Sequence, residues 1–86
     1  MTFDDIDFKG GKVNTIELLG EDMLEIHYEN GYMIDVGFYD VSSSFVVTII
    51  KDNDWVNIEK ELEAKTEMDL KSQIKYAVNY VLSKNI

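Results

Sequence analysis

The 86-residue chain contains no cysteine and no arginine, and it has only one histidine. The lack of cysteine excludes disulfide bonds, a thiolate nucleophile and cysteine metal clusters, and it fits an intracellular protein best. The lack of arginine removes the side chain that grips phosphate through two parallel hydrogen bonds. With 17 acidic residues against eight basic ones, the net charge of −9 also repels nucleic acid and anionic membranes. The composition therefore argues against direct binding of DNA, RNA or lipid.

Long apolar runs are also missing. No run approaches the roughly 18 residues that a membrane-spanning helix needs. The acidic start MTFDD lacks the basic region of a signal peptide. A chain of 86 residues forms a single domain, spanning 1–86, with one modest core. We therefore expect a soluble, cytoplasmic, single-domain protein.

The clearest pattern is the alternating stretch over 22–38, DMLEIHYENGYMIDVGF, whose two arms are joined by Glu-Asn-Gly at 29–31. A two-residue loop would set Ile26 opposite Asp35 and mix apolar with charged partners. A three-residue loop, with its glycine in the left-handed conformation, sets Ile26 opposite Ile34 and places every apolar pair on one face. We predict this second register. Its cross-strand pairs are Tyr28 with Tyr32, Ile26 with Ile34, Leu24 with Val36, Glu25 with Asp35 and His27 with Met33.

A first strand precedes this hairpin over 12–19, where polar and apolar residues alternate. Setting Ile16 opposite Ile26 and Leu18 opposite Leu24 would continue the apolar face of the hairpin. Residues 1–11 carry Phe3, Ile6 and Phe8 among polar or charged residues, and they end in the turn signal Gly-Gly. We expect them to form a short edge strand or a loose arm.

The most hydrophobic run in the chain is FVVTII at 45–50. It is rich in β-branched residues and apolar on both faces, which is typical of a strand that is central or covered twice. Its second face therefore needs cover from the arm at 1–11, from a second copy of the chain or from a partner.

The segment 55–65 carries conflicting signals. Its alternation fits a strand, whereas the run EKELEAK favours a helix. A single helix continuing through 58–82 would not keep its apolar residues in one stripe, so we predict a strand. Its expected apolar face carries Val56, Ile58, Leu62 and Ala64, and its expected acidic ridge carries Glu59, Glu61 and Glu63.

The sequence Thr-Glu-Met-Asp at 66–69 has the form of a capping box, and apolar residues repeat at helical spacing from Leu70 to Leu82. We predict a helix over 67–83. The expected fold is α+β, with an antiparallel meander of about five strands over 12–65 and one C-terminal helix packed on one face.

The lack of a recognisable catalytic motif predicts that the protein is not an enzyme. There is no glycine-rich phosphate loop and no serine in a nucleophile-elbow pattern. Glu25, His27 and Asp35 share one face of the hairpin and could offer ligands to a divalent ion, but no fourth ligand is identifiable, and a solvated polar face is the simpler interpretation. The segment 52–54 begins like a calcium loop without the expected glycine and distal glutamate. We predict no catalytic residue, no metal site and no cofactor.

Recognition of a basic protein has the most support. The acidic residues offer carboxylates to lysine or arginine, and aromatic residues with polar tips supply anchors. The candidate partner-binding residues are Glu25, His27, Asp35, Tyr39, Trp55, Glu59, Glu61 and Glu63. In the alternative interpretation, Trp55 caps the core, the glutamates only discourage edge-to-edge strand pairing, and the acidity only maintains solubility. The negative charge, the lack of catalytic groups and the strand at 45–50 that is apolar on both faces together favour an interface.

Three segments carry a family resemblance: GKVNTIELLGEDMLEIHYENGYMIDVGFYD, then FVVTIIKDNDW, then TEMDLKSQIKYAV. In size, element order and the acidic Trp-bearing turn at 52–55, most of the chain resembles small acidic immunity proteins of bacterial toxin systems. The resemblance implies tight inhibition of a cognate toxin, often a basic nuclease, and assigns no functional residue. One alternative is a phage anti-defence protein, such as an anti-CRISPR, whose carboxylates mimic nucleic-acid phosphates. Another is a structural homodimer with no inhibitory role.

Overall fold

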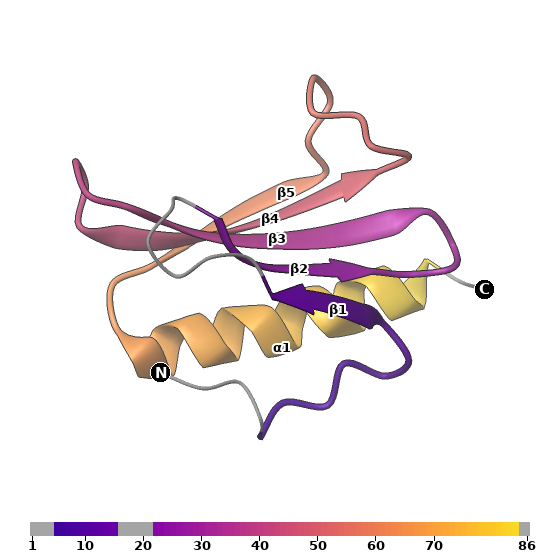
Figure 1. The fold of residues 1–86 in the computed structure, drawn as a ribbon, viewed down its shortest axis with the longest axis horizontal. Helices are drawn as coiled ribbons and strands as arrows, with labels where there is room; N and C mark the ends of the chain where they lie inside the picture. The colour runs from indigo at the N-terminus through magenta and orange to yellow at the C-terminus, as the bar shows by residue number, and fades with distance from the viewer. Residues whose placement is uncertain (1–4, 16–21, 85–86) are drawn as a thin grey trace.

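The computed structural model describes residues 5–15 and 22–84 as one five-stranded antiparallel sheet with a single helix packed against it (Figure 1). The strands lie in the sheet in the order in which they occur in the chain. The predicted α+β meander with one C-terminal helix is therefore confirmed. The elements are β1 Lys12–Thr15, β2 Asp22–His27, β3 Tyr32–Tyr39, β4 Ser44–Lys51, β5 Lys60–Ala64 and α1 Glu67–Ser83.

The hairpin of β2 and β3 has the predicted register. Gly31 adopts a positive φ of +90°, and its amide donates to the Tyr28 carbonyl at 3.1 Å. The Tyr28 amide then donates to the Tyr32 carbonyl at 2.9 Å, which closes the loop with these two tyrosines paired. Ile26 lies opposite Ile34, as the choice of a three-residue loop requires. The remaining predicted pairs are also present: Leu24 with Val36, Glu25 with Asp35 and His27 with Met33.

Helix α1 has the predicted bounds. The Thr66 hydroxyl accepts a hydrogen bond from the Asp69 amide at 3.1 Å, which satisfies one of the free amides of the first turn. One stripe of the helix faces the sheet, and its buried members are Leu70, Ile74, Ala77, Val78 and Val81. Within the part of the chain that the structure describes, no helix is both long enough and apolar enough to cross a membrane.

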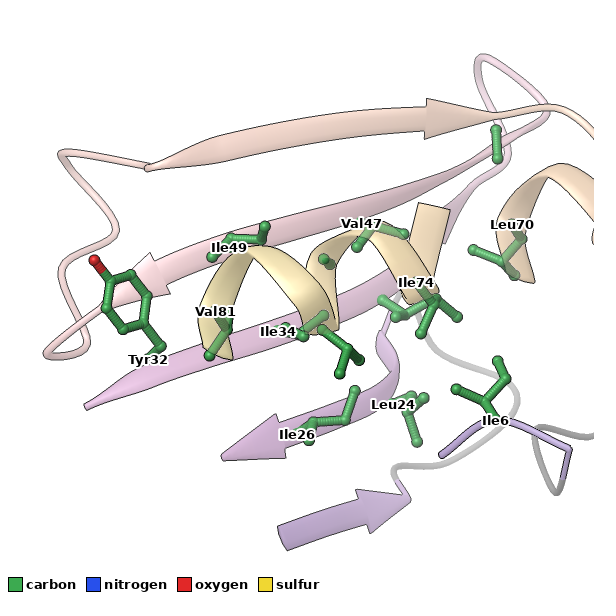
Figure 2. Close-up of a cluster of buried hydrophobic side chains, with 14 residues drawn as sticks. Ile6, Leu24, Ile26, Tyr32, Ile34, Val47, Ile49, Leu70, Ile74 and Val81 are labelled. Carbon is green, nitrogen blue, oxygen red and sulfur yellow. The ribbon is translucent and has the colours of Figure 1, made fainter. Parts of the chain in front are cut away.

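The hydrophobic core lies between α1 and one face of the sheet (Figure 2). Ile26, Ile34 and Ile49 point from three adjacent strands toward the helix, and each is 0 % exposed. The N-terminal segment contributes Ile6, which is 6 % exposed and belongs to the same cluster. The described part of this segment, residues 5–11, forms no strand and is here called the arm.

The predicted partners of β1 are wrong. Ile26 pairs with Val13 instead of Ile16, and Leu24 pairs with Thr15; Ile16 and Leu18 themselves lie outside the described residues. This register places Gly11 beside Ile26 and Tyr28, where an added Cβ would lie 2.5 Å from the Ile26 side chain and 2.7 Å from the Tyr28 ring. The close approach of the chains at this point requires a glycine, and alternation of apolar residues alone could not reveal it.

The strand predicted over 55–65 is shorter than expected. Only Lys60–Ala64 forms β5, and the preceding residues belong to the loop from β4. Val56 and Ile58, which we expected to face the core, are 90 % and 41 % exposed. The reason is local: the Asp54 carboxylate accepts hydrogen bonds from the amides at 56 and 57, at 3.0 and 3.1 Å, and holds them in a turn.

Candidate functional site

The face of the sheet opposite α1, here called the open face, carries a row of acidic side chains. Strand registers place Glu25 opposite Asp35, Asp35 opposite Thr48 and Thr48 opposite Glu61. Asn14 of β1 lies opposite Glu25 and completes a line across all five strands. We call Glu25, Asp35 and Glu61 the carboxylate row.

The carboxylate row has accessible ends and a buried centre. The Glu25 side chain is 26 % exposed and Glu61 is exposed, whereas Asp35 is only 5 % exposed. Glu25 and Glu61 are separated by three strand spacings, about 14 Å. His27 lies 3.1 Å from the Glu25 carboxylate, on the same strand and the same face. A partner can therefore reach the ends of the row, while little of Asp35 is available for contact.

Glu63 adds a fourth carboxylate to the open face, beside Glu61 on the edge strand β5. Its side chain is 58 % exposed. The Ser44 hydroxyl donates to one of its oxygens at 3.4 Å, and Lys65 approaches the other at 3.7 Å. The predicted acidic ridge is thus present at two of its three positions.

The third expected member of the ridge, Glu59, lies on the other side. One of its carboxylate oxygens accepts hydrogen bonds from the Tyr32 and Tyr80 hydroxyls, both at 3.2 Å. The backbone explains the change of side, because the Glu59 amide donates to the Ile49 carbonyl although Ile49 is already paired with Lys60. Two residues then face one, as in a β-bulge, and the strict alternation of β5 ends at Lys60.

This arrangement affects both tyrosines. Burial, reinforced by the neighbouring Glu59 charge and its hydrogen bond, raises the pKa of Tyr32 above its usual value. The pKa of Tyr80 is raised for the same reasons. Figure 2 shows Tyr32 at the end of the sheet from which the loop to β5 departs. Glu59 thus joins that loop to β3 and to α1.

Most lysines lie away from the open face. Lys51 and Lys60 face the helix side, opposite Tyr32 and Ile49 in the strand registers. Lys71, Lys75 and Lys84 belong to α1 or to its C-terminal cap, and Lys9 lines a hollow together with Lys75 and Asn79 of the helix. Only Lys12 and Lys65 of the eight lysines lie toward the margins of the open face.

The two predicted aromatic contacts lie at opposite ends of the sheet. Trp55 is 47 % exposed in the loop between β4 and β5, and Tyr39 is 40 % exposed at the end of β3. The exposure of Val56 and Ile58 beside Trp55 was not predicted, because a strand that buries them was expected there. An Asp at 54 followed by an Asn at 57 was the available signal for a turn.

Residues 5–15 and 22–84 contain no group of three or more His, Cys, Asp or Glu side chains placed to hold a metal ion. Comparison with known proteins gave no matching family model, no matching curated protein and no matching solved structure.

Proposed function

We propose that this protein binds a basic protein through its open face and inhibits it. The observation that carries the proposal is the separation of charge between the two sides of the sheet. The open face holds Glu25, Glu61 and Glu63, while six of the eight lysines lie on the helix side or on α1. The four carboxylates of the open face, with Asp35 included, outnumber the two lysines at its margins, so this face is acidic where a partner can approach.

Such a surface speeds the encounter with a positively charged partner. Complementary fields raise association rates above those of neutral surfaces, and this gain falls as salt screens the charges. The cross-strand row also spaces its accessible carboxylates on a rigid sheet, so that no loop must order before contact. Fast, salt-sensitive association is therefore the expected behaviour.

Inhibition follows when the bound surface is a basic functional cleft. An acidic sheet face can occupy a cleft that would otherwise receive nucleic acid, as the resemblance to immunity proteins of toxin systems implies. The identity of the partner separates this proposal from the anti-defence alternative: a toxin nuclease supports the first, and a nucleic-acid-binding defence protein supports the second.

The test is affinity capture of the tagged protein from host lysate at low and high salt, followed by kinetics with the retained protein. We expect one basic protein to be retained at low salt and released at high salt. Its own activity should fall as the purified chain is added. The double variant E61K/E63K should lower the association rate about tenfold and flatten its salt dependence.

A matched control is the double variant D5K/D7K, which changes the net charge equally on the helix side. Asp5 lies near Lys71, and Asp7 near Lys9. These exposed ion pairs contribute little stability, so the variant should fold normally. Equal slowing by both double variants would mean that overall charge, and not the open face, governs binding.

A further inference from the structure

The loop between β4 and β5, residues 52–59 and here called the Trp55 loop, exposes three large apolar side chains within four positions. Trp55, Val56 and Ile58 are 47 %, 90 % and 41 % exposed. Figure 1 shows this loop projecting beyond the sheet, on the side away from α1. Isolated exposed apolar residues are ordinary, but such a group on one projecting loop is a feature of contact sites.

The Trp55 loop is held in shape at both ends. Near its start, the Asp54 carboxylate accepts hydrogen bonds from the Val56 and Asn57 amides and from the Asn57 side chain, the last at 3.0 Å. These hydrogen bonds, that of the Asn57 side chain above all, lower the pKa of Asp54. At its end, Glu59 is bound by two tyrosine hydroxyls. A contact made by a loop that is already ordered loses less conformational entropy on binding.

The surroundings of the exposed group are acidic. Asp52 and Asp54 precede Trp55, and Glu59 and Glu61 follow Ile58, so four carboxylates outnumber the two lysines of these flanks, Lys51 and Lys60. We propose that the Trp55 loop is the apolar anchor of the interface, inserting Val56 and Trp55 into an apolar hollow of the partner whose rim is basic. This inference rests on the proposed function. It specifies which part of the chain supplies binding affinity, whereas the carboxylates raise the association rate. Aromatic anchors surrounded by charges are the usual centres of such interfaces.

The same charges disfavour two other occupants. An anionic membrane would repel the carboxylates on either side of the loop. A second copy would bring two equally acidic loops together and place like charges face to face. Of these three binding partners, only a basic protein makes favourable contacts both with the exposed apolar side chains of the loop and with the carboxylates around them.

The experiment uses the full chain and two synthetic probes of equal charge: an amphipathic peptide of lysine and leucine, and an oligolysine. Trp55 is the only tryptophan, so its fluorescence reports on the loop alone. With the lysine–leucine peptide, the emission should shift to shorter wavelength and acrylamide quenching should fall; with oligolysine, neither should change. Val56→Ser should weaken binding of the lysine–leucine peptide about tenfold.

The matched control is Val41→Ser, which alters a fully exposed valine in the turn at the opposite end of the sheet and should change affinity less than about twofold. If Val56→Ser has no effect while E61K/E63K still weakens both peptides, the anchor is overturned and the basic-partner function stands. If neither peptide binds, both proposals fall.

Two further measurements would also overturn the anchor. The first is a shift of Trp55 emission on mixing with phosphatidylserine or phosphatidylcholine vesicles but not with the lysine–leucine peptide, which would assign the loop to a membrane. The second is sedimentation showing a dimer for the unaltered chain and a monomer for Val56→Ser, which would assign the loop to a second copy.

Discussion

The two faces of the sheet bury side chains in different ways. On the helix side, aliphatic residues from four strands, α1 and the arm form one continuous cluster. On the open face, Met33 and Ile50 are 6 % and 0 % exposed but do not belong to that cluster. The buried polar side chains in the described part of the chain, Asp35, Ser44 and Thr48, all face this second side.

Burial on the open face therefore depends on satisfied polar groups as well as on apolar contact. In the described part of the chain, no buried side-chain nitrogen or oxygen lacks a hydrogen-bond partner. Such satisfaction is necessary, because an unpaired buried polar group is costly. Ile50 and Thr48 are buried within a single chain, so at these positions the second face of β4 needs no second copy to cover it.

The sharpest test of this contrast compares adjacent isoleucines of β4 that point to opposite faces. Ile49 and Ile50 are both 0 % exposed. Ile49→Ala should cost about 4 kcal/mol of unfolding free energy, because the packed helix holds the resulting cavity open. Ile50→Ala should cost about 2 kcal/mol, because α1 lies against the other face and the open face can collapse further into the space left. Urea unfolding of both variants measures the two values.

Met68→Ala serves as the control for this pair, since Met68 is 79 % exposed on α1 and its loss should change stability by less than about 0.5 kcal/mol. A loss for Ile50→Ala equal to or greater than that for Ile49→Ala would show that the open face is as tightly packed as the core.

A smaller effect is expected at Gly31, which keeps the hairpin in the register that decides which residues reach each face. Its φ is +90°, and an added Cβ would lie 2.5 Å from Asp52 Oδ1. Gly31→Ala should cost about 2 kcal/mol through backbone strain and displacement of Asp52. Gly10→Ala is the matched control, because Gly10 has the same φ but nothing within 4 Å of an added Cβ, so about 1 kcal/mol is expected. Denaturant unfolding measures both values, and equal losses of unfolding free energy would show that the contact with Asp52 contributes nothing.

The smallest effect concerns the arm that completes the helix side. The Tyr28 hydroxyl donates to the Phe8 carbonyl at 2.8 Å, and burial, aided by the nearby Asp7 charge, raises the pKa of Tyr28 to about 12. Because the folded-state pKa lies above the ordinary value of 10.0, this stability is complete below pH 10 and is lost as pH rises toward 12.

Tyr28→Phe should therefore cost about 1 kcal/mol at neutral pH and make the alkaline loss of stability shallower. Thermal unfolding between neutral pH and pH 12 measures both effects. Tyr76→Phe, which alters a tyrosine that is 45 % exposed, is the control. If stability falls with rising pH as steeply in Tyr28→Phe as in the unaltered chain, groups other than Tyr28 cause the alkaline loss of stability.

Much of the fold could be predicted from local signals. The register of β2 and β3 followed from loop length together with alternation, and helix α1 followed from Thr66 and its apolar spacing. These features are encoded within short stretches of sequence. The pairing of β1 depends instead on the close approach of Gly11 to Tyr28, which is far away in sequence.

The candidate site was predictable only in part, for the same reason. Alternation correctly placed Glu25 and Asp35 together on one face, and Glu61 and Glu63 on one side of β5. It failed at Glu59, because a bulge against Ile49 and two distant tyrosine hydroxyls determine where that side chain lies. It failed also for the Trp55 loop, where a single Asp carboxylate competes with the strand for backbone amides.

The position of Glu59 has a consequence for how the protein opens. Its carboxylate links the base of the Trp55 loop to Tyr80 of α1, and the Asn30 side chain donates to the Val81 carbonyl at 3.1 Å, which ties the hairpin turn to the same helix end. We expect these linked segments to open together, as one cooperative unit with a shared opening free energy. A ligand held by the loop would slow amide hydrogen exchange in the last turn of the helix, although it never touches it.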